Sequence, residues 1–171
     1  PEEMEDIVTE AMRYSLLAGG KRLRCALALE FCLALGGSKE DVLPFACALE
    51  MVHAYSLIHD DLPCMDDDDM RRGKPSCHIA FGEANALLAG DGLLTKAFEV
   101  MAQQSKIPPE RTVLAVGVLA QAIGHHGMIG GQRMDLQNEG KEVGIEVIEQ
   151  TNRLKTGALI IAAAQLGSIA A

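Results

Sequence analysis

Apolar residues recur at helical spacing along most of the chain, and glycine and proline residues divide this pattern into segments. Gly19 and Gly20 stop the first segment, and Gly36 and Gly37 stop the second. Ser38 is a suitable N-cap for the third, which Pro63 interrupts, and Pro109 stands at a first-turn position. The pattern predicts helices over about residues 7–17, 23–35, 41–62, 83–104, 109–139 and 144–171.

The fold class that follows is all-α. Sustained period-two alternation is missing, β-branched residues are never concentrated, and Ala and Leu dominate. We therefore expect a bundle of long antiparallel helices, several of them apolar on most faces and so buried on more than one side. The final apolar segment, TGALIIAAAQLGSIAA, has nothing after it to cover it. We expect residues 1–171 to form a single helical domain that lacks N-terminal and C-terminal parts.

Composition narrows the class of protein. A chain of 171 residues with 49% hydrophobic content is expected to be globular, and a net charge of -9 argues against general nucleic-acid binding. The five cysteines form an odd set without a C-x-x-C pair, which favours a reduced, cytoplasmic protein. We expect no leader peptide and no stable membrane insertion, because no run of about 18 apolar residues stands out.

The most informative segment is HDDLPCMDDDDMRRGKP, residues 59–75. Six aspartates fall between Asp60 and Asp69, and the cations Arg71, Arg72 and Lys74 follow. So many like charges repel one another unless a cation lies among them, and carboxylate oxygens suit Mg²⁺. Magnesium keeps few protein ligands and shares phosphate oxygens, so the segment suggests a site for a metal-bridged phosphate ester. The alternative is a solvated acidic loop.

Helical spacing adds geometry to this segment. His53 and Asp60 are seven residues apart, so they share one helix face to within about 20°. Asp60 and Asp61 end that helix, where the helix dipole disfavours anions, so we expect a cation close to them, again a metal ion. If the chain bulges at Pro63, Asp66 returns to the neighbourhood of Asp60, and both carboxylates can hold the same ions.

A second basic cluster is GGKRLR, residues 19–24. Lys21 and Arg24 are three residues apart, on one helical face, and the glycines before them permit close approach of a ligand to the helix N-terminus. Two cations at a helix N-terminus make a diphosphate site that needs no metal. The alternative is an ordinary solvated helix end.

In combination these motifs resemble the trans-isoprenyl diphosphate synthases, the polyprenyl synthetase family, and most closely the bacterial farnesyl diphosphate synthases. SLLAGGKRLR, the aspartate-rich block, AGDGLLTKAFE, GGQRMD and RLKTGAL occur in the family's order over nearly the whole chain. The resemblance implies an isoprenoid synthase fold around a central cavity. It also implies head-to-tail condensation of isopentenyl diphosphate with dimethylallyl or geranyl diphosphate.

The resemblance also implies residue roles. Asp60 and Asp66 match the Mg²⁺ ligands, and Asp60, Asp66, Arg71 and Lys155 match catalytic groups. The isopentenyl diphosphate pocket corresponds to Lys21, Arg24, His53 and Arg72. The allylic diphosphate ligands correspond to Arg71, Gln132, Lys155 and Thr156. Tyr55 and Ser56, just before Asp60, match positions that set chain length, and the bulky Tyr55 implies a fifteen-carbon farnesyl product.

Further expectations come from the same resemblance. The family uses three Mg²⁺ ions, one of which needs a second aspartate-rich motif that these 171 residues lack. The diphosphate leaves an allylic carbocation, which the isopentenyl double bond attacks. A homodimer is also implied.

Rival interpretations remain open. A geranylgeranyl diphosphate synthase or a non-catalytic regulatory subunit of a heteromeric prenyl synthase would share these motifs, although damaged aspartate motifs would mark the latter. A class I terpene cyclase would not need Lys21 and Arg24. A redox bundle with carboxylate-bridged metals would carry a pair of Glu-x-x-His motifs, and the sequence lacks such a pair.

Overall fold

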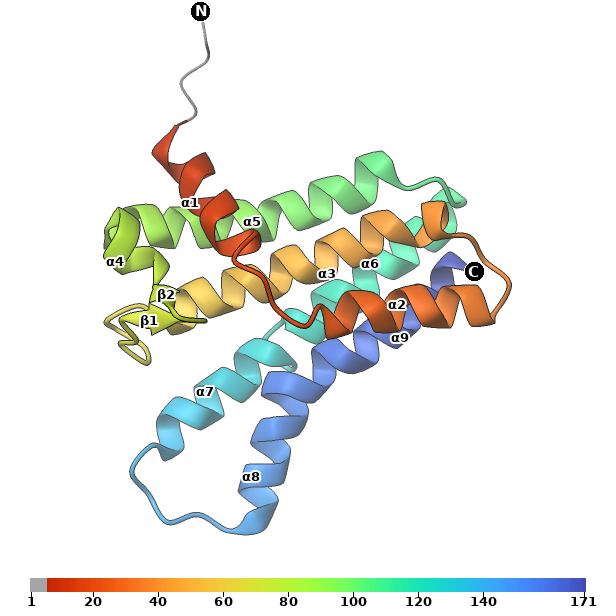
Figure 1. Ribbon diagram of the computed structural model, residues 1–171. Coiled ribbons are helices and arrows are strands. Elements are labelled where there is room, and N and C mark those ends of the chain that lie inside the picture. The colour runs from red at the N-terminus through yellow and green to blue at the C-terminus, as the bar shows by residue number, and fades with distance from the viewer. Residues whose placement is uncertain (1–5) are drawn as a thin grey trace, which may run out of the picture. The chain divides into compact units, whose positions relative to one another are not determined.

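A computed structural model describes residues 6–171 of the chain (Figure 1). Its residues group into two compact units. The first takes in the chain up to Arg22 together with Glu50–Glu99, and the second comprises Leu23–Leu49 and Val100–Ala171. Residues 1–5, which open the domain predicted over 1–171, lie outside the described residues. The prediction of one domain over the whole length stays a prediction.

The first unit is built from helices and one small hairpin. Asp6 caps its first helix, because the Asp6 carboxylate accepts hydrogen bonds from the backbone N–H groups of Val8 and Thr9, each 3.0 Å long. The elements are α1 (Ile7–Leu16), the second half of α3 (Lys39–Asp60), β1 (Met70–Arg71), β2 (Lys74–Pro75), α4 (Cys77–Phe81) and most of α5 (Glu83–Gln104).

The hairpin is the one departure from an all-α chain within residues 6–171. Met70 pairs with Pro75 and Arg71 with Lys74, antiparallel. Arg72 and Gly73 form the turn with φ of 54° and 78°. Two successive positive φ values define a type I′ turn, whose twist suits a hairpin. Strands of two residues are too short to leave an alternating pattern, so the sequence did not predict them. The all-α class is otherwise confirmed.

Close backbone contacts hold the first unit together. Helices α3 and α5 lie side by side, since the His59 Nε2 atom is 3.1 Å from the Leu87 carbonyl oxygen. A side chain at Gly90 would clash there, because its Cβ would lie 2.1 Å from His59 Nε2. Helix α1 packs on α4 and the hairpin. Tyr14 stacks edge-on against Phe81, with ring centroids 5.3 Å apart, and its hydroxyl donates to the Pro75 carbonyl at 2.8 Å.

The second unit is wholly helical within the described residues. Its centre is α9, which packs on α2 and α6 and buries Leu159 and Leu166 (Figure 1). The elements are α2 (Leu23–Ala34), the first half of α3, the end of α5, α6 (Pro109–Ile123), α7 (Met128–Asn138), α8 (Ile145–Asn152), a π-helical turn (Arg153–Gly157) and α9 (Ala158–Ala170). Ser38 precedes α3 and accepts a 3.2 Å hydrogen bond from the Asp41 N–H, as expected of an N-cap.

Two predicted helices are interrupted. The helix expected over 109–139 breaks after Ile123 and resumes at Met128, across the sequence GHHG, whose two glycines weaken a helix. The helix expected over 144–171 contains the π-helical turn, which lies against α7. A Cβ at Gly131 would come 2.2 Å from the Lys155 backbone nitrogen, so the two backbones touch at this point. A contact between distant segments therefore accompanies the local change of helix type.

Two helical stretches are long and apolar enough to cross a membrane by length and composition alone, Lys39–Asp60 and Pro109–Asn138. The expectation that no such run occurs is therefore wrong as a statement about sequence. Helices in the core of a protein can have the same length and composition. In Lys39–Asp60, 61% of the apolar window is buried, which fits a core helix, whereas the figure is 33% in Pro109–Asn138.

We predict opposite effects for two helical glycines. The Cβ of Gly167→Ala would lie 2.2 Å from the Ala28 carbonyl oxygen, so α9 and α2 must separate at a cost of about 1–3 kcal/mol. Gly117→Ala meets no atom within 4 Å and should stabilise α6 by up to about 1 kcal/mol. Urea unfolding of both variants measures these effects. A Gly167→Ala protein as stable as the parent would contradict the described packing of α9 on α2.

Candidate functional site

The acidic segment folds back on the end of α3. The backbone N–H of Asp66 donates to the Asp60 carbonyl oxygen at 2.8 Å, and the N–H of Met65 donates to the Leu62 carbonyl oxygen at the same distance. The turn at Pro63 therefore returns Asp66 to Asp60, as the sequence predicted. Asp66 is exposed and Asp60 is partly buried, so this end of α3 presents carboxylates toward solvent.

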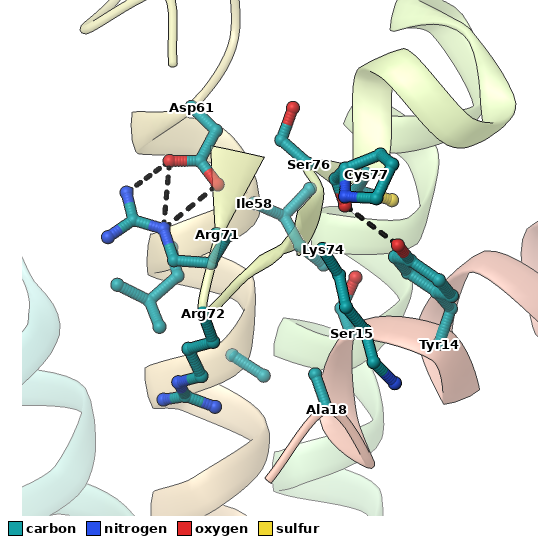
Figure 2. A pocket seen from close by; sticks show the side chains of 13 residues that line it. Tyr14, Ser15, Ala18, Ile58, Asp61, Arg71, Arg72, Lys74, Ser76 and Cys77 are labelled. Carbon is teal, nitrogen blue, oxygen red and sulfur yellow. Dashed lines mark hydrogen bonds and ion pairs between the residues drawn. The ribbon is translucent and has the colours of Figure 1, made fainter. Parts of the chain in front are cut away.

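Asp61, unlike Asp60 and Asp66, is buried, with only 2% of its surface exposed. The Arg71 Nε atom is 3.1 Å from both Asp61 carboxylate oxygens, and Arg71 Nη2 also contacts Oδ1 (Figure 2). The hydrogen bond that Arg71 donates to Asp61, opposed in part by burial, raises the pKa of Arg71. The cation predicted beside this aspartate is thus a guanidinium group, whereas the sequence had suggested a metal ion for both Asp60 and Asp61.

Arg71 keeps part of its donor capacity. Its Nη2 atom lies 3.4 Å from an oxygen of the exposed Asp68, whereas Nη1 makes no hydrogen bond to any residue in the described range 6–171. A guanidinium can bind two anionic groups in its plane. Arg71 is therefore fixed by a buried carboxylate on one edge and can bind a further anion on another.

An open pocket lies beside this pair within the first unit, with about 430 Å³ of empty space that includes open solvent. Residues of α1, α3, the hairpin and the start of α4 line it (Figure 2). Its charged lining consists of Asp61, Arg71, Arg72 and Lys74. Three cations face one buried, already paired carboxylate, so the balance of charge at the pocket favours an anionic group.

The GGKRLR segment differs from its prediction. Helix α2 begins only at Leu23, and Arg22 has a φ of 49°, so Lys21 precedes the helix instead of lying on it. The prediction that Lys21 and Arg24 share one helical face is wrong for this reason. Lys21 is exposed, and Arg72 donates a hydrogen bond to the Gly19 carbonyl oxygen. Arg24 belongs to α2 in the second unit.

Three residues of α3 lie before the acidic segment. Tyr55 is 6% exposed and packs edge-on against His59, with ring centroids 5.6 Å apart. Burial, with a smaller contribution from the charge of Asp60, raises the pKa of Tyr55 to about 12. The Ser56 hydroxyl donates to the carbonyl of His53 at 3.0 Å. Tyr55 is therefore a neutral, buried aromatic group one turn before the first aspartates.

The second unit carries the remaining predicted residues on α7 and the π-helical turn. Lys155 Nζ lies 2.6 Å from an oxygen of Asp135. The side-chain amide nitrogen and oxygen of Gln132 are both buried without a hydrogen-bond partner in the described residues. Leaving such groups unsatisfied costs about 1–3 kcal/mol each, so a polar ligand or water is favoured beside them. Thr156 is exposed.

The donor set fits a hard cation held by few protein ligands. No group of three or more His, Cys, Asp or Glu side chains gathers for a metal within residues 6–171. The five cysteines are all free. Zinc and iron sites usually need more ligands, but Mg²⁺ binds through one or two carboxylates and completes its shell with water and phosphate oxygens. Asp60 and Asp66 match that requirement.

Sequence reasoning missed three residues of this region. Asp61 was treated as a metal-adjacent carboxylate, and Arg22 and Glu50 were given no role. Arg22 and Glu50 form an ion pair, and Glu50 is only 8% exposed. The sequence held one signal for Glu50. With His53 it forms a single Glu-x-x-His motif, a spacing typical of carboxylate-bridged metal sites. The ion pair with Arg22 accounts for Glu50 without a metal.

Known proteins share the sequence of this chain over most of its length. The polyprenyl synthetase family model matches residues 5–171. The chain is 52% identical over 168 residues to the heterodimeric geranylgeranyl pyrophosphate synthase large subunit 1 of Arabidopsis thaliana, covering 95% of this chain and 45% of that protein. It is 48% identical over 160 residues to the farnesyl diphosphate synthase of Bacillus subtilis (strain 168), covering 92% and 54%.

A solved structure agrees with these matches. The FPP/GFPP synthase of Zymomonas mobilis superposes with a TM-score of 0.93 at 43% identity, covering 99% of this chain and 62% of that one. The chain spans about half the length of the curated relatives it matches. The fold is that of the isoprenoid synthases. Within that class, the chain belongs to the polyprenyl synthetase family.

We predict that Asp61 and Arg71 stabilise the fold as a coupled pair. Asp61→Asn leaves a buried guanidinium edge without its anion, and Arg71→Gln leaves a buried carboxylate without its cation, so each should destabilise the protein. The double variant removes both charges and should lose less than the sum, with a coupling of about 1–3 kcal/mol. Urea unfolding of the four proteins measures this coupling. Strictly additive losses would mean that the pair contributes nothing.

Proposed function

We propose that the protein is a trans-prenyltransferase that condenses isopentenyl diphosphate with dimethylallyl or geranyl diphosphate and releases farnesyl diphosphate. The observation that carries this proposal is the return of Asp66 to Asp60 beside the fixed guanidinium of Arg71. Carboxylates for a metal and a cation for a phosphate thus occur together in the segment from Asp60 to Arg71. Membership of the polyprenyl synthetase family supports the same reaction class.

Asp60 and Asp66 are the proposed Mg²⁺ ligands. The bound Mg²⁺ would neutralise charge on the allylic diphosphate as it leaves. The exposed carboxylate of Asp66 needs little dehydration to take up such a hydrated ion. The family resemblance implies three ions, and the third would depend on a second aspartate-rich motif outside these 171 residues.

The proposed substrate ligands are those that the family resemblance implies. In the first unit, Arg71 binds the allylic diphosphate, whereas Lys21, His53 and Arg72 bind isopentenyl diphosphate. In the second unit, Arg24 is assigned to isopentenyl diphosphate, and the allylic ligands are Gln132, Lys155 and Thr156. Family membership supports the assignments in the second unit, and the unsatisfied amide of Gln132 adds to that support.

These side chains would assist the reaction by electrostatic stabilisation of the leaving diphosphate. Arg71 and Lys155 are cations whose interaction with the diphosphate strengthens as the allylic C–O bond breaks and negative charge grows on the leaving oxygen. The isopentenyl double bond then attacks the allylic carbon, and a proton leaves the new intermediate for the diphosphate. No side-chain nucleophile is needed.

The product length is assigned from Tyr55, with Ser56 as its neighbour in the same role. The buried ring of Tyr55 stands one turn before the first aspartates, where it would limit the room for a growing apolar chain. A geranylgeranyl diphosphate synthase is the second candidate. The names of similar proteins, farnesyl diphosphate synthase in one case and geranylgeranyl pyrophosphate synthase in another, favour neither length.

A cytoplasmic homodimer is the proposed form of the protein. The free cysteines are compatible with a reducing compartment, and exposed apolar side chains such as Val113 and Leu114 on α6 could be covered by a partner. A role as the regulatory subunit of a heteromeric enzyme is the alternative. The undamaged carboxylates Asp60 and Asp66 argue for catalysis by this chain.

We predict that Asp60→Ala and Asp66→Ala each lower turnover by at least about 100-fold, because metal-based charge stabilisation is lost. Helicity measured by circular dichroism should not change. Asp69→Ala is the matched control, since Asp69 is exposed in the same acidic segment and, among residues 6–171, contributes only its backbone carbonyl, to Ser76. Condensation of isopentenyl and geranyl diphosphates is assayed in the full-length gene product with Mg²⁺. Near-normal rates in either Asp60→Ala or Asp66→Ala would exclude the metal assignment.

We predict that Tyr55→Ala lengthens the product beyond fifteen carbons, because truncating the buried ring opens space before the aspartates. Tyr55→Phe retains the ring and should keep the farnesyl product. Chromatography of the dephosphorylated products distinguishes the two outcomes. If Tyr55→Ala gave the same products as the parent, the ring would not set the chain length.

A further inference from the structure

The loop between α1 and α2 has an unusual backbone. Three of its residues have positive φ: Gly19 at 86°, Gly20 at 131° and Arg22 at 49°. Glycine adopts such values freely, but a residue with a side chain loses about 1–2 kcal/mol in the left-handed region. Arg22 therefore needs contacts that offset this cost.

The side chain of Arg22 supplies such contacts. Its Nη1 atom forms an ion pair with the Glu50 carboxylate, and its Nη2 atom donates to the Leu16 carbonyl oxygen at 2.8 Å. Leu16 is the last residue of α1, where a cation is favoured by the helix dipole. Glu50 is only 8% exposed, and its carboxylate therefore needs a nearby cation. Arg22 thus links the loop, the end of α1 and the middle of α3.

A second arginine ties the same loop to the hairpin. Arg72 Nη1 donates to the Gly19 carbonyl oxygen. A Cβ at Gly20 would lie 3.0 Å from Arg72 Cζ, so the glycine leaves room for the guanidinium. The Nε and Nη2 atoms of Arg72 make no hydrogen bond within the described part of the chain. They can bind an anion while Nη1 holds the loop.

Two proposed substrate ligands, Lys21 and His53, lie close in sequence to the two residues of the ion pair. Lys21 directly precedes Arg22, and His53 lies three residues after Glu50 on the same face of α3. Fixing Arg22 on Glu50 therefore also fixes the backbone that carries Lys21 relative to the helix that carries His53. Both residues belong to the first unit, as does Arg72.

We propose that the Arg22–Glu50 ion pair is a positioning device that holds Lys21 in register with His53 and Arg72 for binding the diphosphate of isopentenyl diphosphate. The inference rests on the proposed function, because it assigns the pair to one of the two substrates of that reaction. Arg22 and Glu50 do not touch the substrate. Their charges neutralise each other, and the exposed Lys21 ammonium is left to bind the anion.

Two variants test this proposal in the full-length gene product. Arg22→Gly removes the side chain while allowing a φ of 49° without strain, so it isolates the lost contacts from backbone effects. Glu50→Gln keeps the shape of the side chain and removes its charge. Glu40→Gln is the control, because Glu40 is exposed in the first turn of the same helix. Thermal unfolding and circular dichroism establish that each variant is folded.

The expected result is a selective change in substrate use. Each variant should raise KM for isopentenyl diphosphate by about tenfold, since a small misplacement of a binding group is costly. KM for geranyl diphosphate should stay within about twofold, because Arg71, the allylic ligand of the first unit, is held by Asp61 and contacts neither Arg22 nor Glu50. The double variant Arg22→Gly/Glu50→Gln should be no worse than the more affected single variant.

Three results would overturn the proposal. Equal increases in both KM values, or lower stability with both KM values unchanged, would reduce the pair to a structural role. Failure of both single variants to fold would do the same. Failure of the proposed function is separate, since the unmodified protein would then make no prenyl product, and the proposal would fall with it.

Discussion

A buried negative charge is stable only beside a positive one, and this constraint organises the first unit. Asp61 stands at the end of α3 with 2% of its surface exposed, and Arg71 meets both oxygens of its carboxylate. Arg71 lies ten residues further along the chain. The intervening acidic segment therefore has to double back, and the type I′ turn at Arg72 and Gly73 follows directly after the pair. The ion pair and the hairpin depend on one another.

The aspartates of the acidic segment differ in burial, and therefore in the kind of cation that they can bind. Asp61 is withdrawn from solvent and neutralised by a guanidinium, whereas Asp66 is exposed and returns to the end of α3 through its own backbone N–H. A hydrated cation can reach the second kind of carboxylate but not the first. The same division occurs among the arginines of the first unit. Arg22 is committed to Glu50, whereas Arg72 uses one of its nitrogens on the chain and keeps others for a ligand.

The sequence predicted the features that are local. Most helix positions followed from apolar spacing, glycine stops and caps such as Ser38, because these signals act within a few residues. The return of Asp66 to Asp60 was predictable because Pro63 cannot continue a helix. The resemblance supplied the family, which the family-model match confirmed over residues 5–171.

The features that the sequence did not predict depend on distant contacts. The sequence did not predict the break at GHHG, because glycine also occurs inside unbroken helices, as Gly117 does in α6. The π-helical turn accompanies a backbone contact with Gly131, more than twenty residues earlier. The Arg22–Glu50 pair joins residues 28 positions apart, and each of them alone reads as an ordinary charged side chain. The roles assigned to individual site residues stay predictions.

The central claim is that the carboxylates of Asp60 and Asp66 bind a diphosphate through Mg²⁺. Calorimetric titration of the full-length gene product with methylene bisphosphonate, a stable diphosphate analogue, tests it directly when run with and without Mg²⁺. The account predicts strong binding with Mg²⁺ and a loss of at least about 100-fold in affinity without it. Equal affinity under both conditions would contradict the account, because binding would then need only the arginines and lysines.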